Sequence, residues 1–338
     1  MTARPAIAVA IVTHDSASDL AECFAAVAAL TYRPIELVVV DCASRDGSLQ
    51  EAERLARSLP PDIVSTLVPL AENRGFAGGM NAAFAETAAP FVLTLNADAR
   101  PAPDYLERLL ARAEAHPDLR VGAVTGRLVR PLEPGESGPR LLDACGMRLT
   151  STWRHLDRGS GEPDRGQYGA PERVFGATGA ASLFRRAALD DAAIGGEIFD
   201  PRFHSFREDA ELCFRLRERG WEVLYEPAAL CLHRRFNLPE RRSAMPPEVN
   251  CHSLKNRYLL RLYHQTARNF WRTAAPTLAR DLLAFGSALL RERTSLPAYA
   301  WLWRHRSEIL ARRRRIQAHR TLPPRDLDRW FFVSGLPL

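Results

Sequence analysis

Acidic residues in this 338-residue sequence stand where they could bind a metal ion or accept a proton. Asp98 closes the triplet Asn96-Ala97-Asp98 directly after an apolar run, and a divalent cation on a diphosphate needs such an oxygen ligand. Glu208, Asp209 and Glu211 begin a predicted helix, where a carboxylate beside a crevice could act as a general base toward a hydroxyl group. Acids also stand at helix starts for structural reasons, because they complement the helix dipole. Each feature alone therefore has two explanations.

Polar residues follow other apolar runs as well. Thr13-His14-Asp15 comes after the first run and Asp41 to Ser48 after the second, while the segment 73–79 brings three glycines before a predicted helix. Glycine permits close backbone approach and helix N-termini attract anions, which suits a nucleotide. The glycines match neither the phosphate loop of ATPases nor the dinucleotide fingerprint of dehydrogenases, which argues against both classes. His233 ends a strand-like run, where a histidine is either a metal ligand or an ordinary packing residue.

The elements that must position these side chains follow the pattern of βαβ units. We predict buried strands at 6–13, 36–40, 63–68 and 90–95, with helices at 18–30 and 78–87 among them. Further elements are a helix at 104–116, a strand at 122–129, a loop-rich segment at 131–171, a helix at 209–219, a strand at 222–233 and helices from 250 onward. Ligands bind beyond the carboxyl ends of parallel strands. Three polar clusters at such ends therefore favour one polar crevice.

The chain is expected to leave the strand after Asp98. The next residues are Arg100-Pro101-Ala102-Pro103, and proline does not continue a central strand. The Asp98 carboxylate should then project into the crevice. The alternative is that Asp98 caps the following helix, although Asp104 is better placed to do so.

Charge divides the chain into two unequal parts. Apolar residues make up 46% and charged residues 25% of the sequence, values typical of a folded protein. Residues 1–233 carry 25 arginines and no lysine against 33 acids (25 − 33 = −8), whereas residues 234–338 carry 21 basic residues against 7 acids (21 − 7 = +14). Such a basic segment favours an anionic membrane, an acidic ligand or nucleic acid, or it is a solvated face.

The cysteines and the apolar runs indicate in which cellular compartment the protein is expected. Six cysteines without a C-x-x-C pair indicate neither a zinc cage nor a disulfide framework, so we predict reduced thiols and a cytoplasmic protein. The N-terminal apolar run has no small-residue cleavage site, and we predict no signal peptide. The run 282–290 is about half of the roughly 20 residues of a membrane-spanning helix, so no such helix is expected.

In their order along the chain, these motifs resemble the family 2 glycosyltransferases of the GT-A fold, most closely the bacterial rhamnosyltransferase-like branch. The resemblance runs from about residue 6 to 235, and six elements in the right order make it specific. The segment 166–189, with its glycines, also resembles that branch. The matching elements are Thr13-His14-Asp15, Asp41-Cys42-Ala43-Ser44-Arg45-Asp46-Gly47-Ser48, Asn73-Arg74-Gly75-Phe76-Ala77-Gly78-Gly79-Met80-Asn81, Leu95-Asn96-Ala97-Asp98, Glu208-Asp209-Ala210-Glu211-Leu212-Cys213-Phe214-Arg215 and His233.

The resemblance implies an α/β protein with a Rossmann-like, mostly parallel sheet flanked by helices. It implies a catalytic domain over 1–235, and an Arg-rich helical extension follows over 236–338. The implied reaction is an inverting transfer of a sugar, with dTDP-rhamnose as the first candidate donor, from a nucleotide-diphosphate-sugar to a hydroxyl of a glycan or lipid-linked glycan.

The resemblance also implies roles for single residues. The nucleotide-sugar site would comprise Thr13, Asp15, Asp41, Ser44, Asn73, Gly75, Asn81 and Asn96. Asp98 and His233 would coordinate Mg²⁺ or Mn²⁺, Asp209 would be the base, and Glu208 would shape the site or contact the acceptor. The sequence departs from the family pattern at Asp15 and Cys42, where asparagine is usual, and at Glu211, where aspartate is usual. Asn96 replaces the first acid of a two-carboxylate motif, so Asp98 is expected to carry the metal with His233.

The C-terminal segment mixes aromatic residues with arginines. Tryptophans and a basic surface suit peripheral binding to an anionic bilayer at the inner face of the cell membrane, and the alternative is a helix packed on the catalytic domain. We predict no nucleic-acid partner, because no recognised binding module accompanies the charge. The residues concerned are Trp301, Trp303, Trp330, Phe331, Phe332, Arg304, Arg306 and Arg312 to Arg315.

Two other functions stay open at this point. A nucleotidyltransferase uses a similar sheet and metal, but its Gly-rich basic first loop is missing from residues 13–16. An inactive scaffold that binds a nucleotide or carbohydrate is the other, and the intact Asp98, Asp209 and His233 argue against it.

Overall fold

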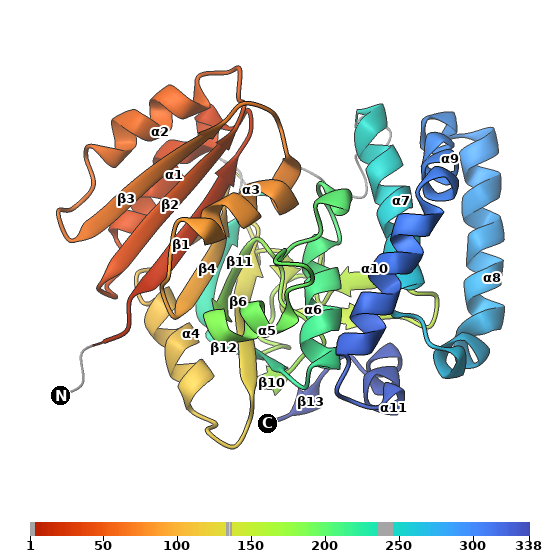
Figure 1. Ribbon diagram of the computed structural model, residues 1–338. Helices are drawn as coiled ribbons and strands as arrows, with labels where there is room; N and C mark the ends of the chain where they lie inside the picture. The colour runs from red at the N-terminus through yellow and green to blue at the C-terminus, as the bar shows by residue number, and fades with distance from the viewer. Residues whose placement is uncertain (1–3, 133–134, 136, 236–245) are drawn as a thin grey trace.

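Figure 1 shows a computed structural model of the protein, in which a long mixed β-sheet crosses the molecule between layers of helices. It describes residues 4–132, 135, 137–235 and 246–338. The described strands are β1 Ile7–Thr13, β2 Ile35–Cys42, β3 Ile63–Leu70, β4 Phe91–Asn96, β5 Ala99–Pro101, β6 Val121–Val129, β7 Leu142–Ala144, β8 Met147–Leu149, β9 His155–Asp157, β10 Glu172–Arg173, β11 Ala181–Arg185, β12 Glu222–His233 and β13 Leu336–Pro337. The described α-helices are α1 Ala17–Ala28, α2 Ser48–Ala56, α3 Gly75–Ala85, α4 Tyr105–Glu114, α5 Arg186–Ala192, α6 Glu208–Glu218, α7 Pro247–His264, α8 Ala267–Leu290, α9 Pro297–Arg304, α10 Arg306–His319 and α11 Pro324–Asp328.

The sheet has a parallel half and a mixed half. Its strand order is β13-β10-β12-β6-β11-β4-β1-β2-β3, with β5 added to β12 and β7 to β6. The neighbours β3, β2, β1 and β4 all run parallel. β11 is antiparallel to both β4 and β6, and β6 pairs in parallel with β12. The predicted mostly parallel α/β sheet with a helical C-terminal region is therefore confirmed.

Alternation along β1 divides the core between the two faces of the sheet. Ile7, Val9 and Ile11 belong to the cluster that packs under α1 and α4. Ala8 and Ala10 belong to the cluster on the opposite face, which includes residues of α3 and α6. Successive side chains of a strand point to opposite faces of the sheet. A strand that is buried on both faces, such as β1, is therefore a continuous apolar run in the sequence.

Several predicted elements agree with the structure within a few residues. The four N-terminal strands and the helix at 104–116 are present as β1 to β4 and α4, and β12 has the predicted bounds of 222–233. The segment 131–171 is largely irregular, but it also contains the three-residue strands β7, β8 and β9. Strands this short show no periodicity in the sequence.

The chain leaves β4 at Asn96, as expected, but it then forms a further strand that was not predicted. Ala99–Pro101 forms β5, which pairs antiparallel with the end of β12 and sets His233 opposite Ala99. Pro101 is tolerated because β5 is a short edge segment. This pairing brings Asp98 next to His233, although the two lie 135 positions apart in the sequence (233 − 98 = 135).

Two of the C-terminal helices, α7 and α11, pack against α6, and the last strand, β13, joins the main sheet. α7 packs against α9 and α10, and β13 adds to β10 at the sheet edge (Figure 1). Trp330 and Phe331 are buried at 1% and 3% exposure, so their predicted place on a membrane-facing surface is wrong. In the described part of the chain, no helix combines the length and apolarity needed to cross a bilayer. The proposed domain boundary at 235 adjoins residues 236–245, which lie outside the described residues.

Candidate active site

The carboxyl ends of β1, β2 and β4 meet at one edge of the sheet. Thr13 is the register partner of Asp41, and Val12 is the partner of Asn96. Both Thr13 and Asp41 are buried, yet Oγ1 of Thr13 and Oδ1 of Asp41 find no hydrogen-bond partner among the described residues. Buried polar atoms are normally paired, so two orphans at a strand edge suit a bound ligand. The predicted gathering of polar clusters at one edge is thus present.

The two loops beyond β1 and β2 are joined by hydrogen bonds. The Asp15 amide donates to Oγ of Ser44 at 3.0 Å, and the Arg45 amide donates to Oδ1 of Asp15 at 2.7 Å. Asp15 has a positive φ of 49°, a conformation that aspartate tolerates better than most residues. The carboxylate at position 15, where asparagine is usual in the family pattern, therefore binds the neighbouring loop.

The glycines at the start of α3 pack against the segment that precedes α6. Gly75 has φ of 63°, and a Cβ on it would lie 2.4 Å from the carbonyl oxygen of His204. The same carbonyl accepts a hydrogen bond from the Ala77 amide at 3.0 Å, while Oδ1 of Asn73 accepts one from the Gly75 amide at 2.8 Å. Only glycine fits such an approach without displacing the backbone.

Asn81 has a different task from the predicted donor contact. Its Nδ2 donates to the carbonyl of Phe199 at 2.8 Å, and its Oδ1 accepts from the amide of Phe199 at 2.9 Å. Both ends of the side-chain amide are therefore occupied by one backbone residue. Asn81 therefore holds the segment around Phe199.

Asp98, His233 and Asp143 form a chain of hydrogen-bonded side chains. Oδ1 of Asp98 lies 3.2 Å from Nε2 of His233, and Oδ2 of Asp143 lies 2.7 Å from Nδ1 of His233. The Arg235 amide donates to Oδ2 of Asp98 at 3.0 Å. Nδ2 of Asn96 lies 3.3 Å from Nε2 of His233. The structure therefore brings the two predicted metal ligands together and adds Asp143 behind them.

The protonation states of Asp98, His233 and Asp143 follow from their burial and from the charges they exert on one another. Burial alone would lower the pKa of His233, but the hydrogen bonds that its ring donates to Asp143 and Asp98 outweigh burial and raise the pKa to about 10. Burial would raise the pKa of Asp98 and of Asp143, but His233 holds both pKa values below the usual range. The three side chains are thus two carboxylates on either side of an imidazolium, whose Nε2 proton a bound cation would displace.

These residues fit a divalent cation by their chemistry. A carboxylate oxygen and an imidazole nitrogen are accepted ligands of Mn²⁺, and Asp143 on Nδ1 leaves Nε2 as the coordinating nitrogen. Among the described residues, no three His, Cys, Asp or Glu side chains converge on one point. Magnesium-type sites commonly use one or two protein ligands and complete the shell with substrate phosphates and water.

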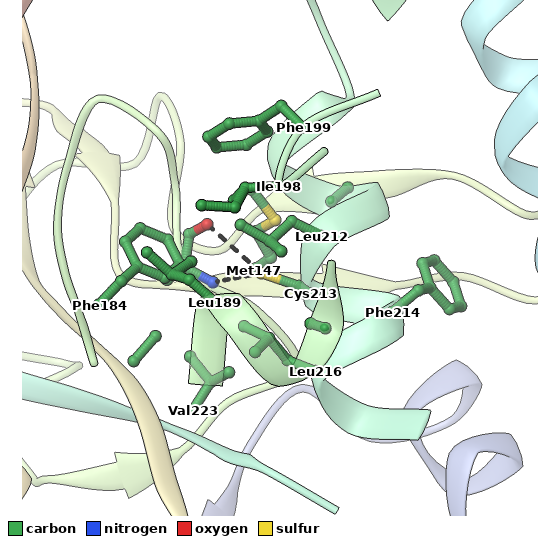
Figure 2. Close-up of a cluster of buried hydrophobic side chains, with 14 of the residues drawn as sticks. Met147, Phe184, Leu189, Ile198, Phe199, Leu212, Cys213, Phe214, Leu216 and Val223 are labelled. Atoms are coloured by element: carbon green, nitrogen blue, oxygen red, sulfur yellow. Dashed lines mark hydrogen bonds between the residues drawn. The ribbon is translucent and has the colours of Figure 1, made fainter. Parts of the chain in front are cut away.

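Asp209 lies in the first turn of α6 beside the segment 176–179. The Gly179 amide donates to Oδ2 of Asp209 at 3.0 Å, and one turn later the Ala177 amide donates to Sγ of Cys213 at 3.2 Å. Figure 2 shows Cys213 within the buried cluster that holds α6, with dashed lines for the hydrogen bonds of its sulfur to a backbone amide and a backbone carbonyl. A Cβ on Gly176 would lie 2.9 Å from Cβ of Cys213, so glycine is needed for this close contact.

Burial sets the protonation of the two acids that begin α6. It raises the pKa of Asp209 to about 6, although the Gly179 amide partly offsets it. Burial and the nearby Asp209 charge raise the pKa of Glu208 well above its usual value. Near neutral pH, Asp209 is therefore largely ionised, while burial and the Asp209 charge both favour the protonated form of Glu208. The third acid, Glu211, is fully buried and paired with Arg215 and His264, so it is structural.

Arg235 connects the two halves of the site. Its guanidinium lies 3.1 Å from Oδ1 of Asp143 and 2.7 Å from Oδ2 of Asp157. The charge of Asp157 in turn contributes to the raised pKa of Asp209. Arg235 follows shortly after His233 in the sequence, whereas Asp143 and Asp157 lie in the segment 131–171 that was predicted to be loop-rich, and sequence reasoning missed them.

The loop directly before α6 contains three residues with positive φ, and a residue of the C-terminal helix α7 supports it. His204, Phe206 and Arg207 all have positive φ, at 61°, 72° and 71°. Nδ2 of Asn256, on α7, lies 2.8 Å from the carbonyl oxygens of Phe203, of Ser205 and of Phe206. Such conformations persist only where the surroundings hold them. Asn256 therefore fixes the loop that leads into Glu208 and Asp209.

Comparison with known proteins decides the family. Residues 8–192, more than half of the chain, match the model of the family described as Glycosyl transferase family 2. The chain belongs to this family. The glycosyltransferase is 25% identical over 299 residues to the N-acetylglucosaminyl-diphospho-decaprenol L-rhamnosyltransferase of Mycobacterium tuberculosis, covering 83% of this chain and 92% of the relative. It is 24% identical over 224 residues to the poly-beta-1,6-N-acetyl-D-glucosamine synthase of Staphylococcus aureus, covering 64% of this chain and 47% of that one.

Solved structures confirm the GT-A fold of the glycosyltransferase. The mannosyltransferase PcManGT from Pyrobaculum calidifontis, in complex with GDP-Man and Mn²⁺, aligns over 94% of this chain and 86% of its own, with a TM-score of 0.52 and 22% identity. The S. aureus protein TarS, in complex with UDP-GlcNAc, aligns over 96% and 89%, with a TM-score of 0.54 and 16% identity. The predicted family and nucleotide-sugar-dependent glycosyl transfer are therefore confirmed.

We expect Asn256→Ala to lower kcat of the glycosyltransferase about tenfold with little change in KM for the donor. The variant removes the support of three loop carbonyls, and leaving buried hydrogen-bonding groups unpaired costs roughly 1–3 kcal/mol. Steady-state kinetics against a fixed donor check this. Asn269→Ala is the matched control, because Asn269 is a buried asparagine on α8 that bonds Trp153 and Asp328 instead. An equal fall in kcat for both variants would mean that Asn256 acts only through stability.

Proposed function

We propose that the protein is a metal-dependent, inverting glycosyltransferase. The observation that carries the proposal is the Asp98–His233 pair, backed by Asp143, at the sheet edge that also presents Thr13 and Asp41. Mg²⁺ or Mn²⁺ held by Asp98 and His233 would stabilise the negative charge that develops on the departing diphosphate. The Mn²⁺ in the complex of the structurally similar PcManGT supports this choice of metal.

The residues of the chain divide the remaining work. The unpaired Oγ1 of Thr13 and Oδ1 of Asp41 would form hydrogen bonds with the base and ribose of the donor, with the Asp41 oxygen as an acceptor. Asp15, Ser44, Asn73 and Gly75 would support that site by fixing its loops. Asp209 would remove the proton from the acceptor hydroxyl as its oxygen attacks the anomeric carbon in line, which inverts the configuration. Glu208, beside it, would shape the site or contact the acceptor.

The donor that we propose is a nucleotide-diphosphate-rhamnose. The rhamnosyltransferase relative, which aligns over most of both chains, supports this choice. Incubation with dTDP-rhamnose, GDP-mannose and UDP-GlcNAc in the presence of Mn²⁺, followed by measurement of nucleoside diphosphate release, tests it. We expect release from dTDP-rhamnose alone, and efficient turnover of either other sugar would assign the donor differently.

The acceptor that we propose is a hydroxyl of a lipid-linked glycan at the inner face of the membrane. The decaprenol diphosphate in the name of the rhamnosyltransferase relative supports a lipid-linked acceptor. The excess of basic residues after 233 supports contact with anionic lipid. The proposed partners are therefore the nucleotide-sugar, the lipid-linked glycan and the membrane surface.

The proposed base gives the reaction a defined pH dependence. Asp209 must be ionised to accept a proton, and its pKa is raised to about 6. Because the deprotonated form disappears as the pH falls through that value, we expect kcat to drop about tenfold for each pH unit below about 6. Measurement of kcat from pH 4.5 to 8 at saturating metal checks this. A profile that stays flat down to the usual pKa of an aspartate would contradict the raised value.

A further inference from the structure

The longest described helix, α8, turns its large apolar side chains away from the protein. Its buried residues are Asn269, Thr273, Thr277 and Ala288, which are polar or small. Eight large apolar side chains on the same helix are exposed, namely Phe270, Trp271, Leu278, Leu282, Leu283, Phe285, Leu289 and Leu290. A surface helix of a globular protein normally shows the opposite arrangement. In α8, therefore, the polar side faces the protein and the apolar side faces the solvent.

The polar side of α8 is well attached to the rest of the molecule. Oδ1 of Asn269 accepts from Nε1 of Trp153 at 2.9 Å, and Oγ1 of Thr277 donates to the carbonyl of Ser151 at 3.1 Å. These contacts join α8 to the β8–β9 hairpin, which also carries Asp157 of the site. The outward orientation of the apolar side is thus set by specific bonds of the polar side.

The exposed residues form a continuous stripe. Trp271, Leu278, Leu282, Phe285 and Leu289 are spaced by seven, four, three and four residues, which places them on one side of a helix. Trp271 and Leu282 are 78% and 73% exposed. In Figure 1, α8 forms the outer edge of the molecule, at the end opposite β3. An exposed apolar surface of this extent marks an interaction site.

Basic residues flank the stripe. Residues 267–306 carry seven arginines, at 268, 272, 280, 291, 293, 304 and 306, against the two acids Asp281 and Glu292 (7 − 2 = +5). Asp281 is already paired with Arg257 and Arg261 of α7. Trp303, on the adjoining helix α9, is 70% exposed and stacks on Arg306. Apolar residues with tryptophan and arginine at their border are the composition of a helix that lies in a membrane interface.

The charge decides among the partners that an apolar stripe could have. A second copy of this chain would bring the same arginines face to face, and like charges repel. Nucleic acid would need cations where the stripe has leucine and tryptophan. An anionic bilayer satisfies both features, since the acyl region takes the apolar side chains and the headgroups take the arginines.

We infer that the exposed face of α8, with Trp303 of α9, is a docking surface for an anionic lipid bilayer. The inference deepens the proposed membrane contact and rests on that part of the proposed function. It also moves the contact from Trp330 and Phe331, which are buried, to residues 270–290. Docked in this way, the enzyme keeps its site beside the membrane through the hairpin that joins α8 to Asp157.

Vesicle binding of the full-length protein tests the surface. Purified protein is sedimented with vesicles of equal parts phosphatidylcholine and phosphatidylglycerol, and in parallel with phosphatidylcholine alone. We expect binding to the anionic vesicles, weakened by salt, and a fall of roughly tenfold or more in the partition coefficient for the double variant Trp271→Gln/Leu282→Gln. Val64→Gln is the matched control, because Val64 is 67% exposed on β3 at the other end of the molecule.

The outcomes separate the surface from the activity. Both variants should keep wild-type nucleoside diphosphate release without lipid, since neither residue lies in the site. Wild-type-like vesicle binding by the double variant, or no binding by the wild type, overturns the docking surface and leaves the transfer reaction untouched. Sedimentation velocity gives a further outcome. If the wild type is a dimer and the double variant is a monomer that still binds vesicles, the docking surface is overturned and the face is assigned to a second copy of the chain.

Discussion

Replacing Asp209 by asparagine should slow glycosyl transfer by about 10²- to 10⁴-fold while donor binding stays close to that of the wild type. Asparagine keeps the size of the side chain, and its amide oxygen can still accept from the Gly179 amide. It cannot take a proton from an acceptor hydroxyl. Single-turnover transfer and calorimetric titration of the donor, performed on the same preparation, separate the two effects.

Glu208→Gln provides the matched control for this experiment. Burial and the Asp209 charge raise the pKa of the Glu208 carboxyl and so favour its protonated form, for which an amide is a close replacement. We expect its loss of transfer to be far smaller than that of Asp209→Asn. If Asp209→Asn retained wild-type turnover, or if Glu208→Gln were the more damaging change, the base would have to be reassigned.

Replacing Asp98 by alanine should abolish the metal dependence of donor binding. The proposed site has two protein ligands, and removal of the only carboxylate should weaken Mn²⁺-dependent donor affinity by about 100-fold or more. Asp143→Asn should cost less, about 10- to 100-fold, because Asp143 orients His233 and does not contact the metal. Donor titrations at a series of Mn²⁺ concentrations measure both effects.

An exposed acid from the same part of the chain serves as the control for Asp98. Asp104 lies at the start of α4, where it pairs with Arg108 and takes no part in the site. Asp104→Ala should bind donor and metal as the wild type does. A wild-type Mn²⁺ response in Asp98→Ala would contradict the assignment of the metal.

The sequence predicted those parts of the fold that depend on continuous local patterns. The apolar runs of β1, β2 and β4 and the turn residues after them are enough to place Thr13, Asp41 and Asn96 at one sheet edge. The family resemblance then joined Asp98 to His233 as one metal site, although no local pattern connects these two candidates. β5 supplies that connection, and it is too short and too rich in proline to be recognised before the structure.

The missed residues all depend on contacts between distant segments. Asp143 and Asp157 stand in an irregular region without periodicity, and only the fold brings them to Arg235. Asn256 lies on a helix that was assigned to a separate extension, yet it bonds the loop before Asp209. The tail aromatics were placed on the surface by composition, whereas packing buries Trp330 and leaves the leucines of α8 exposed. Composition does not determine which face of a helix is turned inward.

Nucleoside diphosphate release from dTDP-rhamnose, measured with and without Mn²⁺ in the presence of a lipid-linked glycan acceptor, is the most direct test of the proposed reaction. We predict release that requires the metal, is stimulated by the acceptor and is lost in Asp98→Ala and in Asp209→Asn. Release of pyrophosphate in place of the nucleoside diphosphate, or equal release after chelation of the metal, would contradict a metal-dependent glycosyl transfer at the Asp98–His233 site.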